Sequence, residues 1–308
     1  MTYLAIAILC SSLFAVIFKL CQQHQIDALP VICINYTIGA ILSWAPIALN
    51  ILTAHQAIES YSLPPLSIVL SCLQGGLFMM GFITMDQSTC RNGVALTTIS
   101  ARASLILPVT FSWLILSQPA PKWIPVVGVI LAMLMIILPN KQQDHAPSIY
   151  RLTSDAIRKR KAAIALCSVF IFYGIADFSL KLVQFSVENA YRDEETLNTH
   201  LTALTGAIFF MSAALSFILC LVKGSFRKHP LNWAIIGWGA LLGAVNVGCT
   251  ACMLRALGMM PTGHFYPLYN IGIVLVSTII GLCFFKERIK IIQLLGFILA
   301  IGAIAFFF

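Results

Sequence analysis

Long apolar runs alternate with short polar segments along the whole chain. Ten runs of about 18–25 residues are present, and each is long enough to cross a bilayer as one helix. The pattern predicts an all-α polytopic membrane protein with about ten transmembrane helices, the first of them formed by the N-terminal run. The predicted spans are residues 2–21, 30–52, 65–86, 93–116, 122–139, 162–186, 200–222, 231–256, 263–285 and 290–308.

The longest hydrophilic stretch divides the chain nearly in half. It contains four consecutive basic residues, 158–161, and no apolar run of its own. We therefore predict three parts: a first five-helix repeat over 1–140, a basic cytoplasmic linker over 141–161, and a second five-helix repeat over 162–308.

Short motifs of the first half recur in the second half at a nearly constant separation. Residues 127–132 match 295–300, with Gly128 and Gly296 separated by 168 positions. An odd number of spans in each half would place the halves in opposite orientations, as in the inverted repeats of many secondary transporters. Three further matches lie at separations of 167, 167 and 162: Gly39-Ala40-Ile41 with Gly206-Ala207-Ile208, Gly76 and Gly81 with Gly243 and Gly248, and Lys19 and Gln22 with Lys181 and Gln184.

The last two spans of each half carry a more specific pattern. In the second half, Gly263 opens a span that ends in Phe285-Lys286-Glu287-Arg288, and Leu295-Gly296 follows in the next span; the first half has Gly93, Ser117-Gln118-Pro119 and Val127-Gly128. This arrangement resembles the EamA repeat of the drug/metabolite transporter superfamily over nearly the whole chain. The resemblance implies a secondary transporter with two inverted repeats, and a central cavity lined chiefly by spans 1, 3, 4, 6, 8 and 9.

Composition and charge agree with a membrane location. Hydrophobic residues make up 59% of the chain and charged residues 10%, against roughly 25% charged residues in soluble domains. The net charge of +8 comes from basic residues grouped between the apolar runs, which is typical of membrane topology and not of nucleic-acid binding.

The same basic residues predict an orientation in the membrane. Fourteen Lys and Arg residues follow odd-numbered spans and four lie on the other side, so the charge bias places the linker in the cytoplasm and both termini outside. The family resemblance implies the opposite, with both termini in the cytoplasm. We expect a multi-pass protein of a bacterial plasma (inner) membrane.

Two ionisable residues lie near the middle of predicted spans, where a charge is costly. Arg102 lies in the fourth span and Asp177 in the sixth, with Lys181 one turn after Asp177. If Asp177 pairs with Lys181, Arg102 is left to bind a substrate carboxylate through its planar fork. Alternatively, Arg102 forms a structural pair with Asp177, or Asp177 takes a coupling proton. Lys19 and Lys181, near helix ends, are expected to snorkel.

Neutral polar residues inside the spans complete the candidate site. Interhelical hydrogen bonds, worth about 0.6 kcal/mol each in membranes, are the simpler explanation for many of them. The predicted substrate-binding residues are Arg102, Asp177, Gln74, Thr98, Asn246, Tyr269 and Asn270, with Asp177 as the coupling-ion candidate.

These features predict a secondary transporter that moves a small polar metabolite, anionic or amino-acid-like, across the plasma membrane by alternating access. Its expected partners are this metabolite, the lipid bilayer and a coupling proton or ion. No nucleotide-binding or hydrolase motif occurs in the sequence, so we expect no enzyme, cofactor or metal, and most of the ten cysteines should act as small hydrophobes. The alternatives are an intramembrane enzyme using Asp177 and His264, and a non-transporting scaffold.

Overall fold

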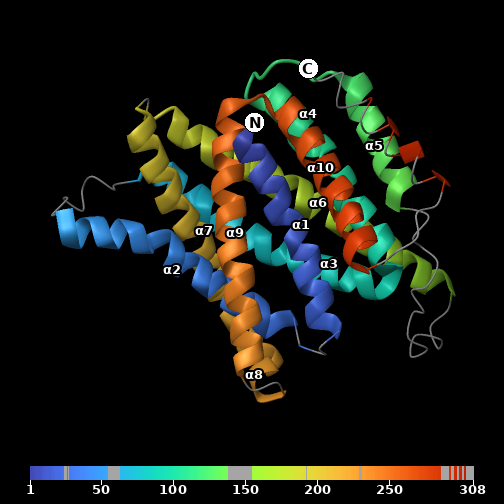
Figure 1. Ribbon diagram of the computed structural model, residues 1–308, viewed down its shortest axis with the longest axis horizontal. Coiled ribbons are helices and arrows are strands. Elements are labelled where there is room, and N and C mark those ends of the chain that lie inside the picture. Colours follow the sequence, from blue (N-terminus) through green and yellow to red (C-terminus); the bar gives the residue numbers. More distant parts are fainter. Residues whose placement is uncertain are drawn as a thin grey trace. The chain divides into compact units, whose positions relative to one another are not determined.

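The structure is a computed structural model of the chain. It describes residues 1–137 apart from 24, 25, 27 and 55–62, residues 155–285 apart from 192, 229 and 230, and, beyond 290, only 291, 292, 295, 296, 298, 299 and 302. Every regular element in these ranges is a helix (Figure 1). The helices are α1 (Thr2–Gln23), α2 (Ala28–Ala54), α3 (Pro65–Ala103), α4 (Ile106–Ile115), α5 (Trp123–Ile137), α6 (Asp155–Glu188), α7 (Glu194–Lys223), α8 (Ser225–Lys228), α9 (Trp233–Met259) and α10 (Thr262–Phe285).

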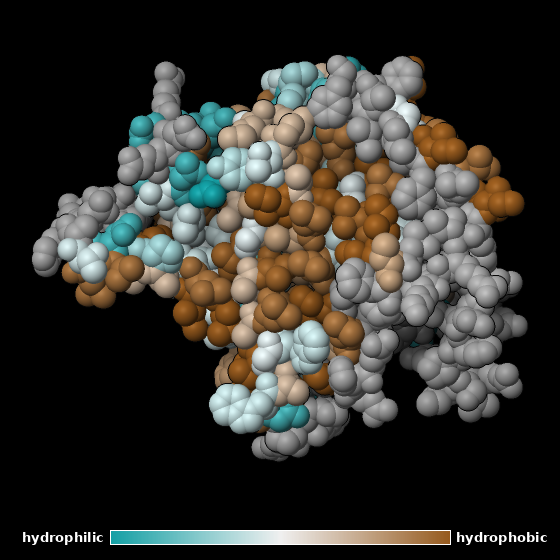
Figure 2. Space-filling model, viewed as in Figure 1, coloured by the Kyte–Doolittle hydropathy of each residue, from teal (hydrophilic) through white to brown (hydrophobic). Residues whose placement is uncertain are grey.

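Seven helical segments of the described chain are long and apolar enough to cross a membrane. Two shorter apolar stretches, Thr2–Phe14 and Val126–Met135, lie in α1 and α5. Large hydrophobic side chains remain on the protein surface, and Figure 2 shows them over the middle of α1 and α9. These observations confirm an all-α polytopic membrane protein. The last predicted span, 290–308, lies almost wholly outside the described residues, so the number ten stays a prediction.

The predicted interruption between the third and fourth spans is absent, because α3 continues through 87–92 to Ala103. The helix instead breaks at Ser104 and Leu105. Pro108 explains why the helix breaks at this position, because proline has no N–H to bond the carbonyl four residues earlier. That carbonyl, of Ser104, accepts from the N–H of Leu107 at 2.9 Å, which tightens the turn before α4.

The chain forms two compact units, each made of segments from both predicted halves. Unit 1 comprises residues 1–79 and 179–260, and unit 2 comprises residues 80–178 and 261–308. The predicted division into repeats at 140 and 162 describes the order of motifs along the sequence. It differs from the two compact units and stays a prediction. Of the predicted linker, 141–154 lies outside the described residues, and α6 already begins at Asp155.

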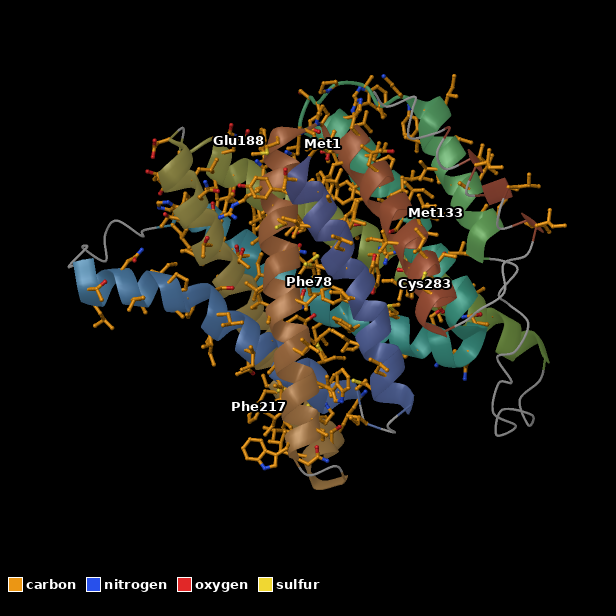
Figure 3. The ribbon with its side chains drawn as sticks, in the orientation of Figure 1. Met1, Phe78, Met133, Glu188, Phe217 and Cys283 are labelled. Carbon is orange, nitrogen blue, oxygen red and sulfur yellow. The ribbon has the colours of Figure 1, made fainter. Side chains whose placement is uncertain are left out.

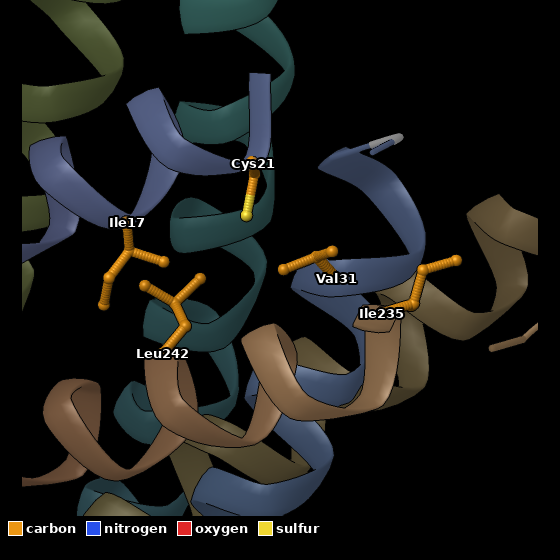
Figure 4. Packing of buried hydrophobic residues seen from close by; sticks show 5 residues of the cluster. All are labelled: Ile17, Cys21, Val31, Ile235 and Leu242. Atoms are coloured by element: carbon orange, nitrogen blue, oxygen red, sulfur yellow. The ribbon is translucent and has the colours of Figure 1, made fainter. Parts of the chain in front are cut away.

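The core of unit 1 joins α1, α2 and α9. Figure 4 shows Ile17 and Cys21 of α1, Val31 of α2, and Ile235 and Leu242 of α9, all at most 5% exposed. Partly buried aromatic and aliphatic side chains pack around them, including Phe14, Ile34 and Trp238. Buried apolar contacts hold these three helices together, and Cys21 serves there as a small hydrophobe, as expected.

Glycines allow α2 to approach α7 and α9 closely. A methyl group added at Gly39 would lie 2.8 Å from the Phe209 ring, and one at Gly206 would collide with Trp44. The indole N–H of Trp44 donates to the carbonyl of Ala203 at 3.2 Å. Small residues at such positions are typical of membrane helix packing, where close van der Waals contact replaces the hydrophobic effect.

In unit 2, α10 packs against α4 and α5. The side-chain oxygen of Gln118 accepts a hydrogen bond from the N–H of Thr262 at 2.9 Å. That N–H belongs to the first turn of α10, whose N–H groups have no partner within the helix. The turn containing Gln118 and Pro119 therefore caps α10 and fixes where the helix begins.

Candidate functional site

Lys181 does not snorkel to the membrane surface. It is 2% exposed, and its ammonium group donates to the side chain of Gln184 at 2.6 Å and to the Leu257 carbonyl at 2.8 Å. Among the described residues it forms no ion pair, so the expected pair with Asp177 is not formed. Leu257 lies in the last turn of α9, where carbonyl groups lack helical partners and a cation is favourable.

The polar chain in unit 1 continues to the end of α6. The amide of Gln184 donates to Glu188 at 2.7 Å, and Glu188 is exposed where α6 ends (Figure 3). Lys181, Gln184 and Glu188 thus form a continuous chain, which we call the Lys181 chain. Two of the three N–H donors of the ammonium group and both ends of the Gln184 amide are bonded within the protein, which indicates a structural role.

Arg102 has a different environment in unit 2. Its Nη1 donates to Oδ1 of Asn270 at 3.2 Å, which is its only hydrogen bond to the described residues. The side chain stays partly exposed. A guanidinium group carries five N–H donors, so most of the donors of Arg102 are available to a ligand.

Asp177 belongs to the same unit and interacts electrostatically with Arg102. Their charged groups do not form an ion pair, and none of the described residues donates a hydrogen bond to the Asp177 carboxylate. The hydroxyl of Tyr266 instead donates to the backbone carbonyl of Asp177, which ties α10 to α6. A cation and an anion therefore lie within electrostatic range of each other without neutralising each other by contact.

Aromatic side chains accompany these charges. Tyr173 lies within electrostatic range of both Arg102 and Asp177, and its hydroxyl contacts the sulfur of Met85 at 2.8 Å. In α10, Phe265 stacks on Tyr269 with ring centroids 5.4 Å apart and meets Tyr266 edge-on at 5.1 Å. The polar cluster of unit 2, as we name it, comprises Arg102, Tyr173, Asp177, Tyr266, Tyr269 and Asn270.

The other predicted site residues are distributed over both units. Thr98 is partly exposed in unit 2, on the same helix as Arg102. Gln74 and Asn246 lie in unit 1, and Asn246 donates to Asn35 at 3.2 Å. Gln74 is fully buried, and neither its Nε2 nor its Oε1 has a hydrogen-bond partner among the described residues. Such a group costs about 1–3 kcal/mol unless a water molecule or a ligand satisfies it.

Three residues of these groups were not predicted as site residues. Asn35 and Tyr173 are polar side chains inside apolar runs, so the rule that selected Asn246 applies equally to them. Tyr266 is also a polar side chain inside an apolar run, but its hydrogen bond to the carbonyl of Asp177 depends on tertiary packing between α6 and α10. Thr97, by contrast, is committed to local structure through a 2.9 Å hydrogen bond with Ser88.

Comparison with known proteins supports the fold and leaves function open. No family model matches the chain. A protein of Haemophilus influenzae, itself described as uncharacterized, is 25% identical over 306 residues, which cover 98% of this chain and 95% of the other. The crystal structure of another protein superposes with a TM-score of 0.70 at 13% identity and covers 99% of this chain and 94% of that one. The second likeness shows a shared fold over the full length.

Proposed function

We propose that this protein is a secondary transporter that moves a small polar metabolite across the plasma membrane by alternating access. The observation that carries the proposal is the polar cluster of unit 2, in which Arg102 keeps free donors near an Asp177 carboxylate that accepts no hydrogen bond. Charged groups inside a membrane protein are costly and usually mark a substrate or ion pathway. The resemblance to EamA-like transporters supports the same conclusion.

The chemistry of the cluster selects the substrate class. A carboxylate matches the planar fork of Arg102 and would form charge-assisted hydrogen bonds with it. Asp177 is not paired with Lys181 and remains to balance Arg102, so the surplus cation of the two is Lys181, which has no ion pair among the described residues, and not Arg102. An amino-acid-like zwitterion would satisfy both groups, with its carboxylate on Arg102 and its ammonium group toward Asp177. Asp177 is then also the residue that takes a coupling proton when the substrate leaves.

The packing of unit 1 supports the inverted repeat that alternating access requires. Gly39 and its repeat counterpart Gly206 each meet an aromatic ring of the other helix, Phe209 and Trp44. Glycines of α3 and α9, which hold the third and eighth predicted spans, also approach helices of the other predicted half. A methyl group at Gly75 would lie 2.7 Å from the Ile208 carbonyl of α7, and one at Gly243 would lie 2.7 Å from the Asn35 carbonyl of α2. The same pairs of helices thus meet in both directions (α2 with α7, α3 with α7 and α9 with α2), as is expected of an inverted repeat.

The orientation in the membrane follows from the distribution of basic residues, with the linker in the cytoplasm. A reporter that is active only outside the cytoplasm should be active when fused after Phe308 and silent when inserted within 145–155. The reverse pattern would establish the orientation that the EamA resemblance implies and refute the one from charge.

Uptake by purified protein in liposomes tests the function. Vesicles preloaded with unlabelled L-amino acids should accumulate a radiolabelled mixture of the same amino acids by exchange, and empty vesicles should do so only under an imposed proton gradient. Protein-free vesicles and vesicles carrying Arg102→Ala are the controls. If exchange with the mixture does not exceed the protein-free background, a series of organic anions is the next substrate class. If no labelled solute exchanges, the protein is not a transporter of this kind.

A further inference from the structure

Gln74 is a buried amide of α3 that makes no hydrogen bond to the described residues. Its side chain is 0% exposed, and neither Nε2 nor Oε1 has a partner. The other buried amides in the described part of the chain differ from it. Gln184 and Asn270 are bonded at both ends, and Asn35 accepts a hydrogen bond from Asn246. Gln74 is therefore the buried amide whose hydrogen-bonding groups are left wholly unused by the described residues.

Ser179 of α6 is a second buried group of this kind in unit 1. It is 2% exposed, and its hydroxyl has no hydrogen-bond partner among the described residues. The two helices meet where the hydroxyls of Ser67 and Ser186 lie 2.8 Å apart. Gln74 follows Ser67 by seven residues and Ser179 precedes Ser186 by seven, so each lies two turns from this bond on the same face of its helix. Both side chains are thus on the faces through which α3 and α6 meet.

Helix α7 holds the backbone beside Gln74. The carbonyl of Gly75 accepts a hydrogen bond from the Ser212 hydroxyl at 3.1 Å. Gly75 also approaches α7 so closely that a methyl group there would lie 2.7 Å from the Ile208 carbonyl. Rotation of α3 that would bring Gln74 to a polar surface would break these contacts. A buried amide held in this way with no partner lowers stability, as binding-site residues commonly do in the ligand-free protein.

The chemistry of the two side chains selects an uncharged carboxamide. The Gln74 amide has two N–H donors and one oxygen acceptor. A second carboxamide matches it at both ends, because its oxygen accepts from Nε2 while one of its N–H groups donates to Oε1. Its other N–H group is left to donate to the Ser179 hydroxyl. A carboxylate has no donor for Oε1, and an alkyl group would leave every polar atom unsatisfied.

We infer that Gln74 and Ser179 form a binding site in unit 1 for the carboxamide group of a transported solute. This inference rests on the proposed transport function and adds which solutes the protein selects. Such a site distinguishes a carboxamide from an apolar group of equal length, because the apolar group gives the buried amide no partner.

Competition in the liposome exchange assay tests the selectivity. L-glutamine should inhibit exchange of the labelled amino acids at a concentration about 10–100-fold lower than L-norleucine, an apolar amino acid of similar length. Gln74→Met keeps the length of the side chain and removes its polar atoms, so this ratio should fall to near one. Ser179→Ala removes a single hydrogen bond and should lower the ratio by about threefold. Ser71→Ala is the control and should keep the wild-type ratio, because the buried Ser71 hydroxyl is already bonded to the Ser67 carbonyl.

Thermal unfolding in detergent distinguishes a ligand site from a structural amide. Without ligand, Gln74→Met should raise the unfolding temperature by about 4 °C, because an unsatisfied buried amide is removed. Gln184→Met is the matched control, since it removes a buried amide that is bonded at both ends, and it should lower the temperature. L-glutamine should raise the unfolding temperature of the wild type and leave that of Gln74→Met unchanged.

Three results would overturn the inference while transport by the wild type stands. A lower unfolding temperature of Gln74→Met, or its failure to fold, would make Gln74 structural. Competition by L-norleucine or L-glutamate equal to that by L-glutamine would show that the protein does not select a carboxamide. An unchanged ratio in folded Gln74→Met would mean that buried water, and not a solute, satisfies the amide. Wild-type protein that exchanges no amino acid would instead refute the transport proposal itself.

Discussion

Lys181 of unit 1 and Arg102 of unit 2 are both cations inside apolar helices, yet their surroundings differ. Lys181 is fully buried and gives hydrogen bonds to Gln184 and to the end of α9. Arg102 is partly exposed and gives one hydrogen bond, to Asn270. The sequence predicted that Arg102 lies near the middle of its span and that Lys181, near a helix end, snorkels, whereas the structure buries Lys181 more deeply than Arg102.

The partners of each cation separate the two roles. A buried ammonium group matched by a helix end and a side-chain amide holds α6 to α9, and a ligand would have to displace these bonds to reach it. A guanidinium group with spare donors, near a carboxylate that accepts no hydrogen bond, is instead incomplete without a ligand or water. The comparison predicts that loss of Lys181 reduces stability and that loss of Arg102 reduces binding.

The largest effect is expected from Arg102→Ala. Affinity for a carboxylate substrate should fall by about 100-fold, because a desolvated charge pair loses one partner. A neutral amide analogue should be affected much less, so the ratio of acid to amide affinity should fall. Arg255→Ala is the matched control, since Arg255 bonds Asn198 at 2.8 Å in unit 1 and should leave this ratio unchanged. An unchanged ratio in folded Arg102→Ala protein would make Arg102 structural.

Asp177→Asn should remove coupling while leaving exchange. One proton moved across 100 mV contributes about 2.3 kcal/mol, which corresponds to a concentration ratio of about 50. The variant should lose this accumulation under a proton gradient but still exchange labelled for unlabelled substrate. Glu188→Gln removes a carboxylate of unit 1 and should keep the accumulation. Gradient-driven uptake that survives in Asp177→Asn would exclude Asp177 as the coupling group.

The sequence predicted the class of fold well because bilayer thickness sets the length of each apolar run. It placed the break between the third and fourth spans at a polar segment, whereas the missing N–H of Pro108 sets the break at Ser104 and Leu105. The partners of Lys181 could not be predicted, because the Leu257 carbonyl comes from a helix 76 residues away. The spacing of residues along one helix instead predicts that Lys181 pairs with Asp177, one turn earlier in α6.

The contact of Arg102 with Asn270 is a different case. They lie 168 residues apart in the fourth and ninth predicted spans, and each is a polar residue inside an apolar run. The sequence could not show that these two residues, among all the polar residues of the spans, touch. That fact depends on how the fourth and ninth spans cross in three dimensions. The sequence therefore predicts which polar residues lie within the spans, and only the packing shows which of them meet.

Lys181→Met should lower stability more than it lowers substrate affinity. The change leaves the Gln184 oxygen and the Leu257 carbonyl without their donor inside the protein, at a cost of about 2 kcal/mol. For a chain of this size, we expect the unfolding temperature in detergent to fall by about 4 °C. Lys223→Met is the control, because Lys223 is exposed at the end of α7 and should change the temperature little. A stable Lys181→Met protein that has lost substrate binding would reverse the roles assigned to the two cations.

The smallest effect, and the most specific test of the Lys181 chain, is expected from Gly258→Ala. A methyl group at Gly258 would lie 2.9 Å from Nε2 of Gln184, closer than carbon and nitrogen normally approach. Gln184 cannot turn away freely, because its two ends are bonded to Lys181 and Glu188. We expect a loss of about 1 kcal/mol, or about 2 °C in unfolding temperature. Gly237→Ala, in the same helix with open space around it, should instead be neutral or gain up to about 1 kcal/mol from helix propensity.

In a Lys181→Met background the penalty of Gly258→Ala should shrink, because Gln184 is then free to move. Equal penalties in both backgrounds would show that Gln184 is held by packing alone and that the hydrogen-bonded chain does not fix it.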